Sequence, residues 1–231
     1  MIAQLRSGLF MLVFFTGSVP IVMTAPILAL FGHRALKIVV MTWVGYHSLC
    51  ARLIAGIVNR VEGAPLNEPA LYAAKHQALY ETFELMRILD GPVVVMRREF
   101  ARIPVWGWAA TKFGLIVIDR EGSAATMRQI MREAAAAKAA GRSVLIFPEG
   151  TRVPPGTTPP IKPGLAGLYR TLAMPTVPIA LDSGLRWPRQ GPKRPGPVNI
   201  VFGDTLPPGL PRKEIEPLIH AGINALETSV V

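Results

Sequence analysis

Acidic residues are missing from the beginning of this 231-residue chain. Residues 1–61 contain no Asp or Glu but five basic residues, Arg6, Arg34, Lys37, Arg52 and Arg60. Charged residues make up 17% of the sequence, below the quarter that is usual in globular proteins, and the mean hydropathy is +0.35. An apolar segment that carries only positive charge is attracted to anionic lipid head groups. The composition therefore predicts contact with a membrane and its lipids.

Cysteine is also scarce, since Cys50 is the single example. One thiol excludes a disulfide framework and a zinc cluster built from cysteines, and its apolar surroundings are typical of a small buried side chain. We expect no bound metal. The net charge of +10 raises nucleic-acid binding as an alternative, but the chain has no basic stripe with interleaved aromatic residues. We therefore expect no nucleic-acid partner.

Two long apolar segments follow each other at the amino terminus. No residue from 7 to 32 carries a full charge, a length that could cross a bilayer core of about 30 Å. Gly17, Pro20 and Pro26 interrupt this segment and predict a short helix, a break and a second start. A cleaved signal peptide is the alternative, but a second apolar segment, residues 35–58, follows at once. Its narrow polar stripe favours a helix in the interface or an inserted hairpin, and two spanning helices stay open.

Short apolar runs alternate with helical patterns after residue 62. This alternation predicts an α/β fold, a largely parallel sheet flanked by helices, preceded by the apolar membrane-associated helical segment. We expect two parts, a membrane-associated helical region at 1–61 and an α/β domain at 62–231. The predicted strands are 70–74, 92–96, 115–118, 143–147, 176–181 and 198–202, and the predicted helices are 79–90, 104–113, 123–140, 165–173 and 211–227.

His76 and Glu81 combine a candidate base with a carboxylate. A neutral imidazole can take a proton from a hydroxyl, while a carboxylate on its other nitrogen holds the tautomer and stabilises the imidazolium that forms. Residues five apart lie on different sides of a regular helix, so we expect His76 to precede the helix that carries Glu81. A His close to a Glu is usually only a surface pair. Catalysis by this pair therefore needs support from other parts of the chain.

The hexapeptide Phe-Pro-Glu-Gly-Thr-Arg at 147–152 directly follows a predicted strand, where α/β proteins place ligand sites. Gly150 lets backbone amides approach an anion, Thr151 adds a hydroxyl, and Arg152 offers a planar fork for phosphate oxygens. An ordinary strand-ending turn is the alternative. A second strand ends in Asp119-Arg120, which forms either a solvated turn or another phosphate clamp. The sequence thus indicates a phosphate-binding edge of the sheet.

Four blocks occur in order: the His-x4-acid pair, the strand ending at Arg120, the hexapeptide at 147–152, and Val-Pro-Ile-Ala at 177–180. Over about residues 73–181 they resemble the glycerolipid acyltransferase family, in particular its 1-acyl-sn-glycerol-3-phosphate acyltransferases. The resemblance implies that residues 62–231 are an acyltransferase domain. Its implied site consists of His76 as general base, Glu81 as its partner where the family usually has Asp, Arg97, Arg120 and Arg152 on the acceptor's phosphate, Gly150 and Thr151 in the binding loop, and Glu149 orienting the acceptor.

The activity that the resemblance implies is transfer of a fatty acyl chain to the free hydroxyl of lysophosphatidic acid, forming phosphatidic acid in phospholipid biosynthesis (EC class 2.3.1). The implied co-substrate is acyl-CoA or a thioester of acyl-carrier protein, with no further cofactor. The implied location is the bacterial inner membrane, with the catalytic domain on the cytoplasmic side. Two alternatives stay open: an acyltransferase for another lysolipid such as a lyso-aminolipid, and a non-catalytic membrane lipid-binding protein of the same fold.

Overall fold

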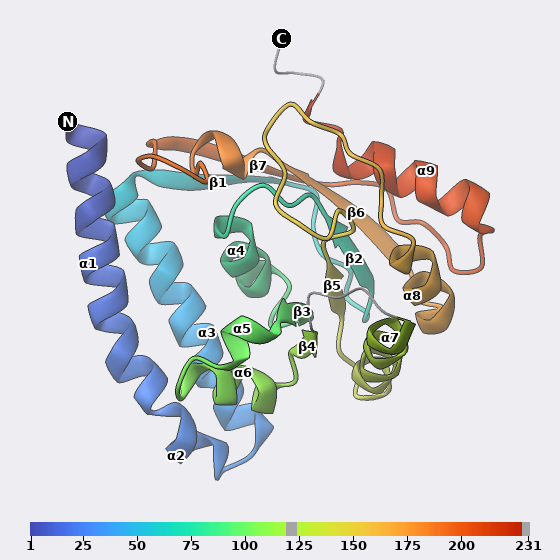
Figure 1. Ribbon diagram of the computed structural model, residues 1–231, viewed down its shortest axis with the longest axis horizontal. Coiled ribbons are helices and arrows are strands. Elements are labelled where there is room, and N and C mark those ends of the chain that lie inside the picture. The colour runs from blue at the N-terminus through green and yellow to red at the C-terminus, as the bar shows by residue number, and fades with distance from the viewer. Residues whose placement is uncertain (119–123, 228–231) are drawn as a thin grey trace.

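Two long helices pack side by side at the amino terminus (Figure 1). The computed structural model describes residues 1–118 and 124–227. By length and apolar character, the stretches Ile2–Ala29 and His33–Ala55 could each cross a membrane. The helices in this region are α1 (Ile2–Met23), α2 (Ala25–Ala29) and α3 (His33–Cys50), which continues into a π-helical turn, η1 (Ala51–Ala55).

Helix α1 continues through Gly17 and Pro20, so the predicted break at these residues is wrong. Gly17 serves close packing instead, because a Cβ atom there would lie 2.1 Å from the Tyr46 hydroxyl oxygen. The same hydroxyl donates a hydrogen bond of 2.7 Å to the carbonyl of Val13. The chain does restart at Pro26, in the first turn of α2, where a missing N–H leaves no helical bond unmade.

Seven strands form one sheet in the order β1-β7-β6-β2-β5-β3-β4. Neighbours from β6 to β4 in this order run parallel, β7 is antiparallel to β6, and β1 is parallel to β7. The prediction of a largely parallel sheet flanked by helices is confirmed. The strands are β1 (Ile57–Glu62), β2 (Leu71–Ala74), β3 (Val93–Arg97), β4 (Ile116–Ile118), β5 (Val144–Ile146), β6 (Thr176–Leu181) and β7 (Gly196–Phe202).

Helices cover both faces of the sheet (Figure 1). Side chains alternate between the two faces along a strand, and β2 places Tyr72 and Ala74 in the core that the amino-terminal helices and α4 share. Leu71 and Ala73 lie in the second core, with α7, α8 and α9. The remaining helices are α4 (Tyr80–Ile88), α5 (Arg98–Ala101), α6 (Trp106–Phe113), α7 (Ala124–Ala139), α8 (Gly164–Leu172), the 3-10 turn η2 (Ser183–Leu185) and α9 (Arg212–Ile223).

Strand β1 begins inside the segment that the apolar pattern predicts as helical. Gly56 ends the helix with φ of 71°, a left-handed conformation that glycine adopts without strain. A Cβ atom at Gly56 would lie 2.6 Å from a guanidinium nitrogen of Arg6, so the turn packs tightly against α1. The chain then pairs Ile57–Glu62 with β7. The division of the chain near residue 61 stays a prediction.

The parallel part of the sheet places the candidate site. Parallel strands end at the same edge, so the segments that follow β2, β5 and β6 converge there. These segments carry His76, Glu149 and Ser183 respectively.

Candidate active site

His76 lies between the end of β2 and the start of α4 at Tyr80, as the five-residue spacing predicts. Its Nδ1 lies 2.8 Å from Oε1 of Glu81, in the first turn of α4. Glu81 is fully buried, while the His76 side chain keeps 18% of its surface exposed. The first turn of a helix favours a negative charge, because the free N–H groups and the helix dipole point toward it.

Four donors surround the Glu81 carboxylate. Oε1 accepts the backbone N–H groups of Gln77 and Ala78 at 2.8 and 2.7 Å in addition to His76, and Oε2 accepts the hydroxyl of Ser183 at 2.6 Å. A carboxylate is a pure acceptor when ionised, so this environment places a proton on Nδ1 of His76. The lone pair is then on Nε2, the nitrogen that a general base needs free.

The imidazole ring of His76 is also held from its face. It stacks on Phe147, with ring centroids 4.0 Å apart and an interplanar angle of 22°. Phe147 is the first residue of the hexapeptide, so the segment after β5 supports the ring directly. Within the described residues, Nε2 makes no hydrogen bond of its own.

Glu149 contacts the main chain of His76. Its Oε2 accepts the His76 N–H at 2.9 Å, and its Oε1 lies 2.8 Å from Nζ of Lys75. Burial raises the pKa of the Glu149 carboxyl, and the ammonium group of Lys75 offsets part of this rise. Both oxygens thus face the protein, and the role of orienting an acceptor stays a prediction.

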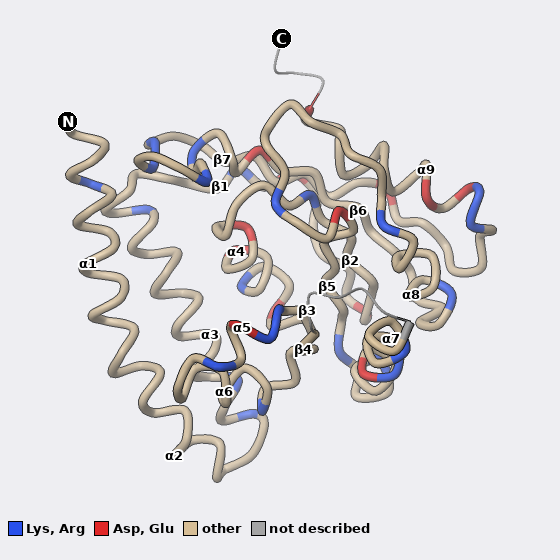
Figure 2. The backbone as a smooth tube through the Cα atoms, viewed as in Figure 1, with Lys and Arg blue, Asp and Glu red and all other residues tan. Residues whose placement is uncertain are grey.

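The predicted phosphate ligands differ in how exposed they are. Gly150 adopts a left-handed φ of 70°, Thr151 and Gly150 are exposed, and Arg152 is half-buried. Arg97 is the last residue of β3 and is exposed. Arg120 lies outside the described residues. Figure 2 shows basic residues near the end of β3 and near β6.

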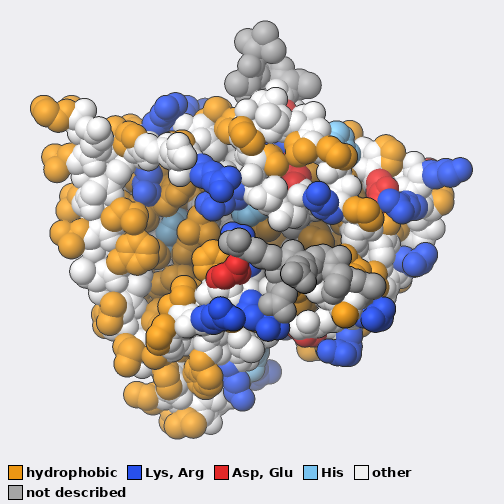
Figure 3. Space-filling view, in the orientation of Figure 1, with side chains coloured by type: hydrophobic (Ala, Val, Ile, Leu, Met, Phe, Trp, Pro, Cys, Tyr) orange, Lys and Arg blue, Asp and Glu red, His pale blue; other side chains and the backbone are white. Residues whose placement is uncertain are grey.

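Figure 3 shows that the same face is hollowed near its centre, and that the visible walls of the hollow are largely hydrophobic. Basic side chains lie beside it. An apolar recess next to cations suits a molecule with a hydrocarbon tail and an anionic head.

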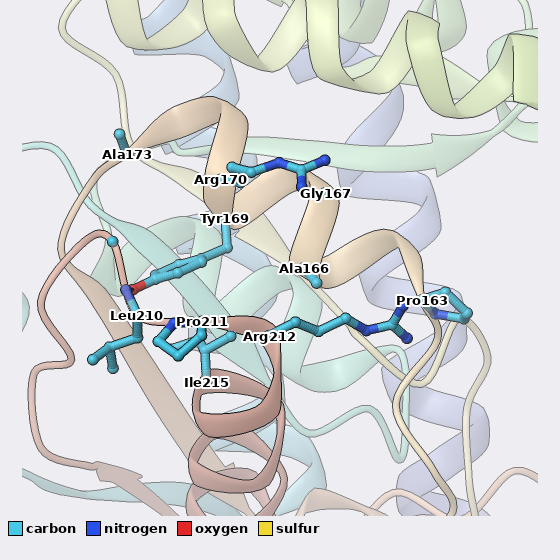
Figure 4. A pocket seen from close by; sticks show the side chains of 11 residues that line it. Pro163, Ala166, Gly167, Tyr169, Arg170, Ala173, Leu210, Pro211, Arg212 and Ile215 are labelled. Carbon is cyan, nitrogen blue, oxygen red and sulfur yellow. The ribbon is translucent and has the colours of Figure 1, made fainter.

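A separate pocket of about 460 Å³ lies between α8 and α9 (Figure 4). Tyr169 points toward Leu210 and accepts its backbone N–H at 2.9 Å, and Arg170 and Arg212 lie at its sides. None of the predicted site residues lines it. It is therefore distinct from the edge that carries His76.

Sequence reasoning missed Ser183 as a partner of Glu81 and Phe147 as a support for His76. Ser183 is 102 residues from Glu81, and a serine after a strand carries no signal of such a contact. Phe147 belongs to the hexapeptide, but its stacking follows only from the neighbouring positions of β2 and β5 in the sheet.

Comparison with known proteins now identifies the family. Residues 57–182 match the family model described as Acyltransferase. The chain is also 33% identical over 174 residues to the 1-acyl-sn-glycerol-3-phosphate acyltransferase of Pseudomonas aeruginosa, covering 74% of this chain and 67% of that protein. The chain belongs to the acyltransferase family. The resemblance that the four sequence blocks carry is therefore confirmed.

Other members of the acyltransferase family match over a similar region. The 1-acyl-sn-glycerol-3-phosphate acyltransferase of Cocos nucifera is 27% identical over 68% of this chain, which spans 53% of that protein. The chain therefore spans between about half and two thirds of these two relatives. The crystal structure of the 1-acyl-sn-glycerophosphate (LPA) acyltransferase from Thermotoga maritima superposes with a TM-score of 0.77 at 19% identity, covering 99% of this chain and 97% of that one. It shares the fold, including the amino-terminal helices.

Proposed function

We propose that this acyltransferase moves a fatty acyl chain from a thioester, acyl-CoA or acyl-carrier protein, to the free hydroxyl of lysophosphatidic acid. The product is phosphatidic acid. The observation that carries the proposal is the pairing of His76 Nδ1 with the buried Glu81 carboxylate at 2.8 Å. That pairing provides a base without a covalent nucleophile, as direct attack by a hydroxyl requires. The names of the relatives supply the acceptor.

In the proposed reaction, His76 Nε2 removes the proton from the acceptor hydroxyl while its oxygen attacks the thioester carbonyl. A new ester C–O bond forms, the C–S bond breaks, and the thiolate takes the proton back from the imidazolium. Glu81 stabilises that imidazolium and fixes its orientation through Nδ1. A positioned base typically contributes about 10²–10⁴-fold to the rate.

The acceptor's phosphate is proposed to bind where the cations meet the hexapeptide. Arg152 and Arg97 supply charge from the ends of β5 and β3, and Arg120 would complete the set. Gly150 and Thr151 shape the loop between them, and Glu149 retains its proposed part in orienting the acceptor. Because guanidinium groups bind phosphate oxygens in pairs, the phosphate can anchor the glycerol near His76.

The acceptor, with its acyl tail, is proposed to come from the membrane. Residues 1–61 carry the apolar helices, and the window of Ile2–Ala29 that could cross a membrane is only 17% buried. The catalytic domain would lie on the cytoplasmic side of a bacterial inner membrane. The separation into this region and an acyltransferase domain at 62–231 belongs to the same proposal.

Purified protein tests the function directly. Mixed with lysophosphatidic acid and palmitoyl-CoA, or with palmitoyl-acyl-carrier protein in a second arm, it should release free thiol and form phosphatidic acid. His76→Ala should lower the rate at least about 100-fold, because the base is lost. His220→Ala is the matched control, since the His220 ring on α9 lies, within the described residues, at hydrogen-bond distance from the carbonyls of Thr158 and Pro159 and makes no bond to His76 or Glu81. Equal rates for His76→Ala and wild type with both donors would falsify the proposal.

A further inference from the structure

Lys75 is a fully buried cation directly before His76. Its Nζ lies 2.8 Å from Oε1 of Glu149 and donates hydrogen bonds of 2.6 Å to the carbonyl of Thr157 and to Oδ1 of Asn224. The ammonium group thus donates two hydrogen bonds, to Thr157 and Asn224, and pairs with the Glu149 carboxylate as an ion pair. A buried charge with these three partners is held in one geometry.

The partners of Lys75 come from distant parts of the chain. Thr157 lies in the loop after the hexapeptide, and Asn224 lies at the end of α9, 149 residues from Lys75. Glu227 continues the cluster: its Oε1 lies 3.6 Å from Nζ of Lys75. Glu227 also accepts the side-chain amide of Gln77 and the backbone N–H of Gly156. The carboxyl-terminal segment is thereby tied to both sides of His76.

Glu149 connects this cluster to the base. One of its oxygens contacts Lys75 and the other accepts the main-chain N–H of His76. His76 is consequently fixed at three points, through its amide, through Nδ1 and through its ring face. The amide contact depends on Lys75, because burial raises the pKa of the Glu149 carboxyl and the ammonium group opposes this rise, whereas four hydrogen-bond donors stabilise the Glu81 carboxylate.

We propose that Lys75 is a positioning residue of acyl transfer, which holds the Glu149 carboxylate against the His76 main chain and is itself held by Asn224 and Glu227. The inference rests on the proposed function. Lys75 does not touch the reacting atoms in it; it acts through Glu149. The end of the chain thus becomes part of the support for the active site.

The charges around Glu149 predict how activity should depend on pH. Lys75 and His76 contact it from the segment after β2, Glu81 contacts Nδ1 of the His76 ring, and Glu227 lies 3.6 Å from Nζ of Lys75. Activity requires the ionised carboxylate of Glu149 and the neutral ring of His76. Burial raises the pKa of the Glu149 carboxyl and Lys75 opposes this rise, so removing the cation favours the protonated carboxyl and activity should be lost at a higher pH. Neutralising Glu227 should have the opposite effect.

The test compares Lys75→Met, Lys75→Arg and Glu227→Gln with Lys138→Met as control. Lys138 likewise donates to main-chain carbonyls, those of Leu172 and Ala173, but at the end of α8. We expect Lys75→Met to lower kcat about tenfold or more at pH 7, with KM for lysophosphatidic acid changed less than twofold, and to move the acid limb of the kcat profile up by about one pH unit. Lys75→Arg should recover part of kcat. Glu227→Gln should move the limb downward, and Lys138→Met should leave it in place.

Hydrogen exchange of the peptide that contains the His76 amide gives a readout without catalysis. It should exchange at least about fivefold faster in Lys75→Met than in Lys138→Met, because the bond to Glu149 is lost. If the wild-type protein has no transferase activity, the proposed function is wrong. Hydrogen exchange of the His76 amide still tests whether Lys75 positions His76. An acid limb and an exchange rate in Lys75→Met equal to those of the control would overturn the inference. If Lys75→Met does not fold, Glu227→Gln decides. An acid limb of the kcat profile that moves upward or stays in place in this variant overturns the inference.

Discussion

Glu81 shows how a single side chain's length can be matched to its backbone. Its two oxygens collect four donors at 2.6–2.8 Å, including the ring of His76 and the hydroxyl of Ser183. The family that the sequence resembles usually has Asp at this position. Aspartate is shorter by one C–C bond, about 1.5 Å, so from the same backbone it could not reach all four donors.

Glu81→Asp should therefore reduce activity in this protein. We expect kcat to fall about 10- to 100-fold, because the tautomer and orientation of His76 are less well fixed, with little change in KM for lysophosphatidic acid. Steady-state kinetics measures both constants. Glu84→Asp on the same helix is the control; Glu84 contacts Asn59 and Ser48 instead of the base, so it should affect stability more than kcat. A Glu81→Asp enzyme as fast as wild type would show that α4 shifts to compensate.

The sequence predicts the contacts of the site between residues close together in the chain, but not the contacts between residues far apart in the chain. The spacing of His76 and Glu81 correctly places the helix start between them, because helical geometry is local. Ser183 and Glu227 approach the same turn from 102 residues after Glu81 and 150 residues after Gln77. Such contacts depend on strand order, which the amino-acid pattern alone does not specify.

The elements themselves follow the sequence pattern closely, with errors at glycine and proline. Strands β2 and β5 are continuous apolar runs, and β3 is apolar up to Met96, as parallel strands covered on both faces should be. Strand β1 is missed because the apolar periodicity of α3 runs on past Gly56. Gly17 is misread as a break because its role, contact with Tyr46 on another helix, depends on packing.

The carboxyl-terminal end of α8 offers a substitution that should stabilise the protein. Ala173, which follows α8, adopts the left-handed conformation with φ 43° and ψ 52°, where a Cβ atom costs roughly 1 kcal/mol relative to glycine. Ala173→Gly should therefore raise the free energy of unfolding by about 0.5–1 kcal/mol and Tm by about 1–4 °C. Thermal unfolding in detergent measures this.

Ala136→Gly is the matched control, since Ala136 is also exposed but lies inside α7. There glycine costs about 1 kcal/mol, so Tm should fall. A decrease in Tm for both substitutions would contradict the conformational argument for Ala173. Neither residue lies at the His76 edge, and kcat should stay unchanged in both.

At the scale of the whole molecule, basic residues and exposed apolar side chains occur together in the amino-terminal region. The first 61 residues carry basic residues without acidic ones, and α1 exposes a row of large apolar side chains although it packs on α3. Leu12, Phe15 and Val19 are 63, 56 and 60% exposed. At spacings of three and four residues they lie on one side of the helix.

This apolar row should determine how firmly the protein binds a bilayer. Each large apolar side chain contributes about 1.5–3 kcal/mol when it is fully buried, so the Leu12→Asp, Phe15→Asp, Val19→Asp triple variant should lose at least about 100-fold in partitioning into vesicles of phosphatidylethanolamine and phosphatidylglycerol. Because these side chains are exposed in the protein, Tm should change little. Leu218→Asp, which alters an apolar residue 46% exposed on α9, should partition like wild type. Cosedimentation over a salt series separates the two forces: the apolar part persists at high salt, whereas attraction of the basic residues to phosphatidylglycerol is screened. If the triple variant still sediments with vesicles at high salt as wild type does, α1 is not the surface that meets the membrane.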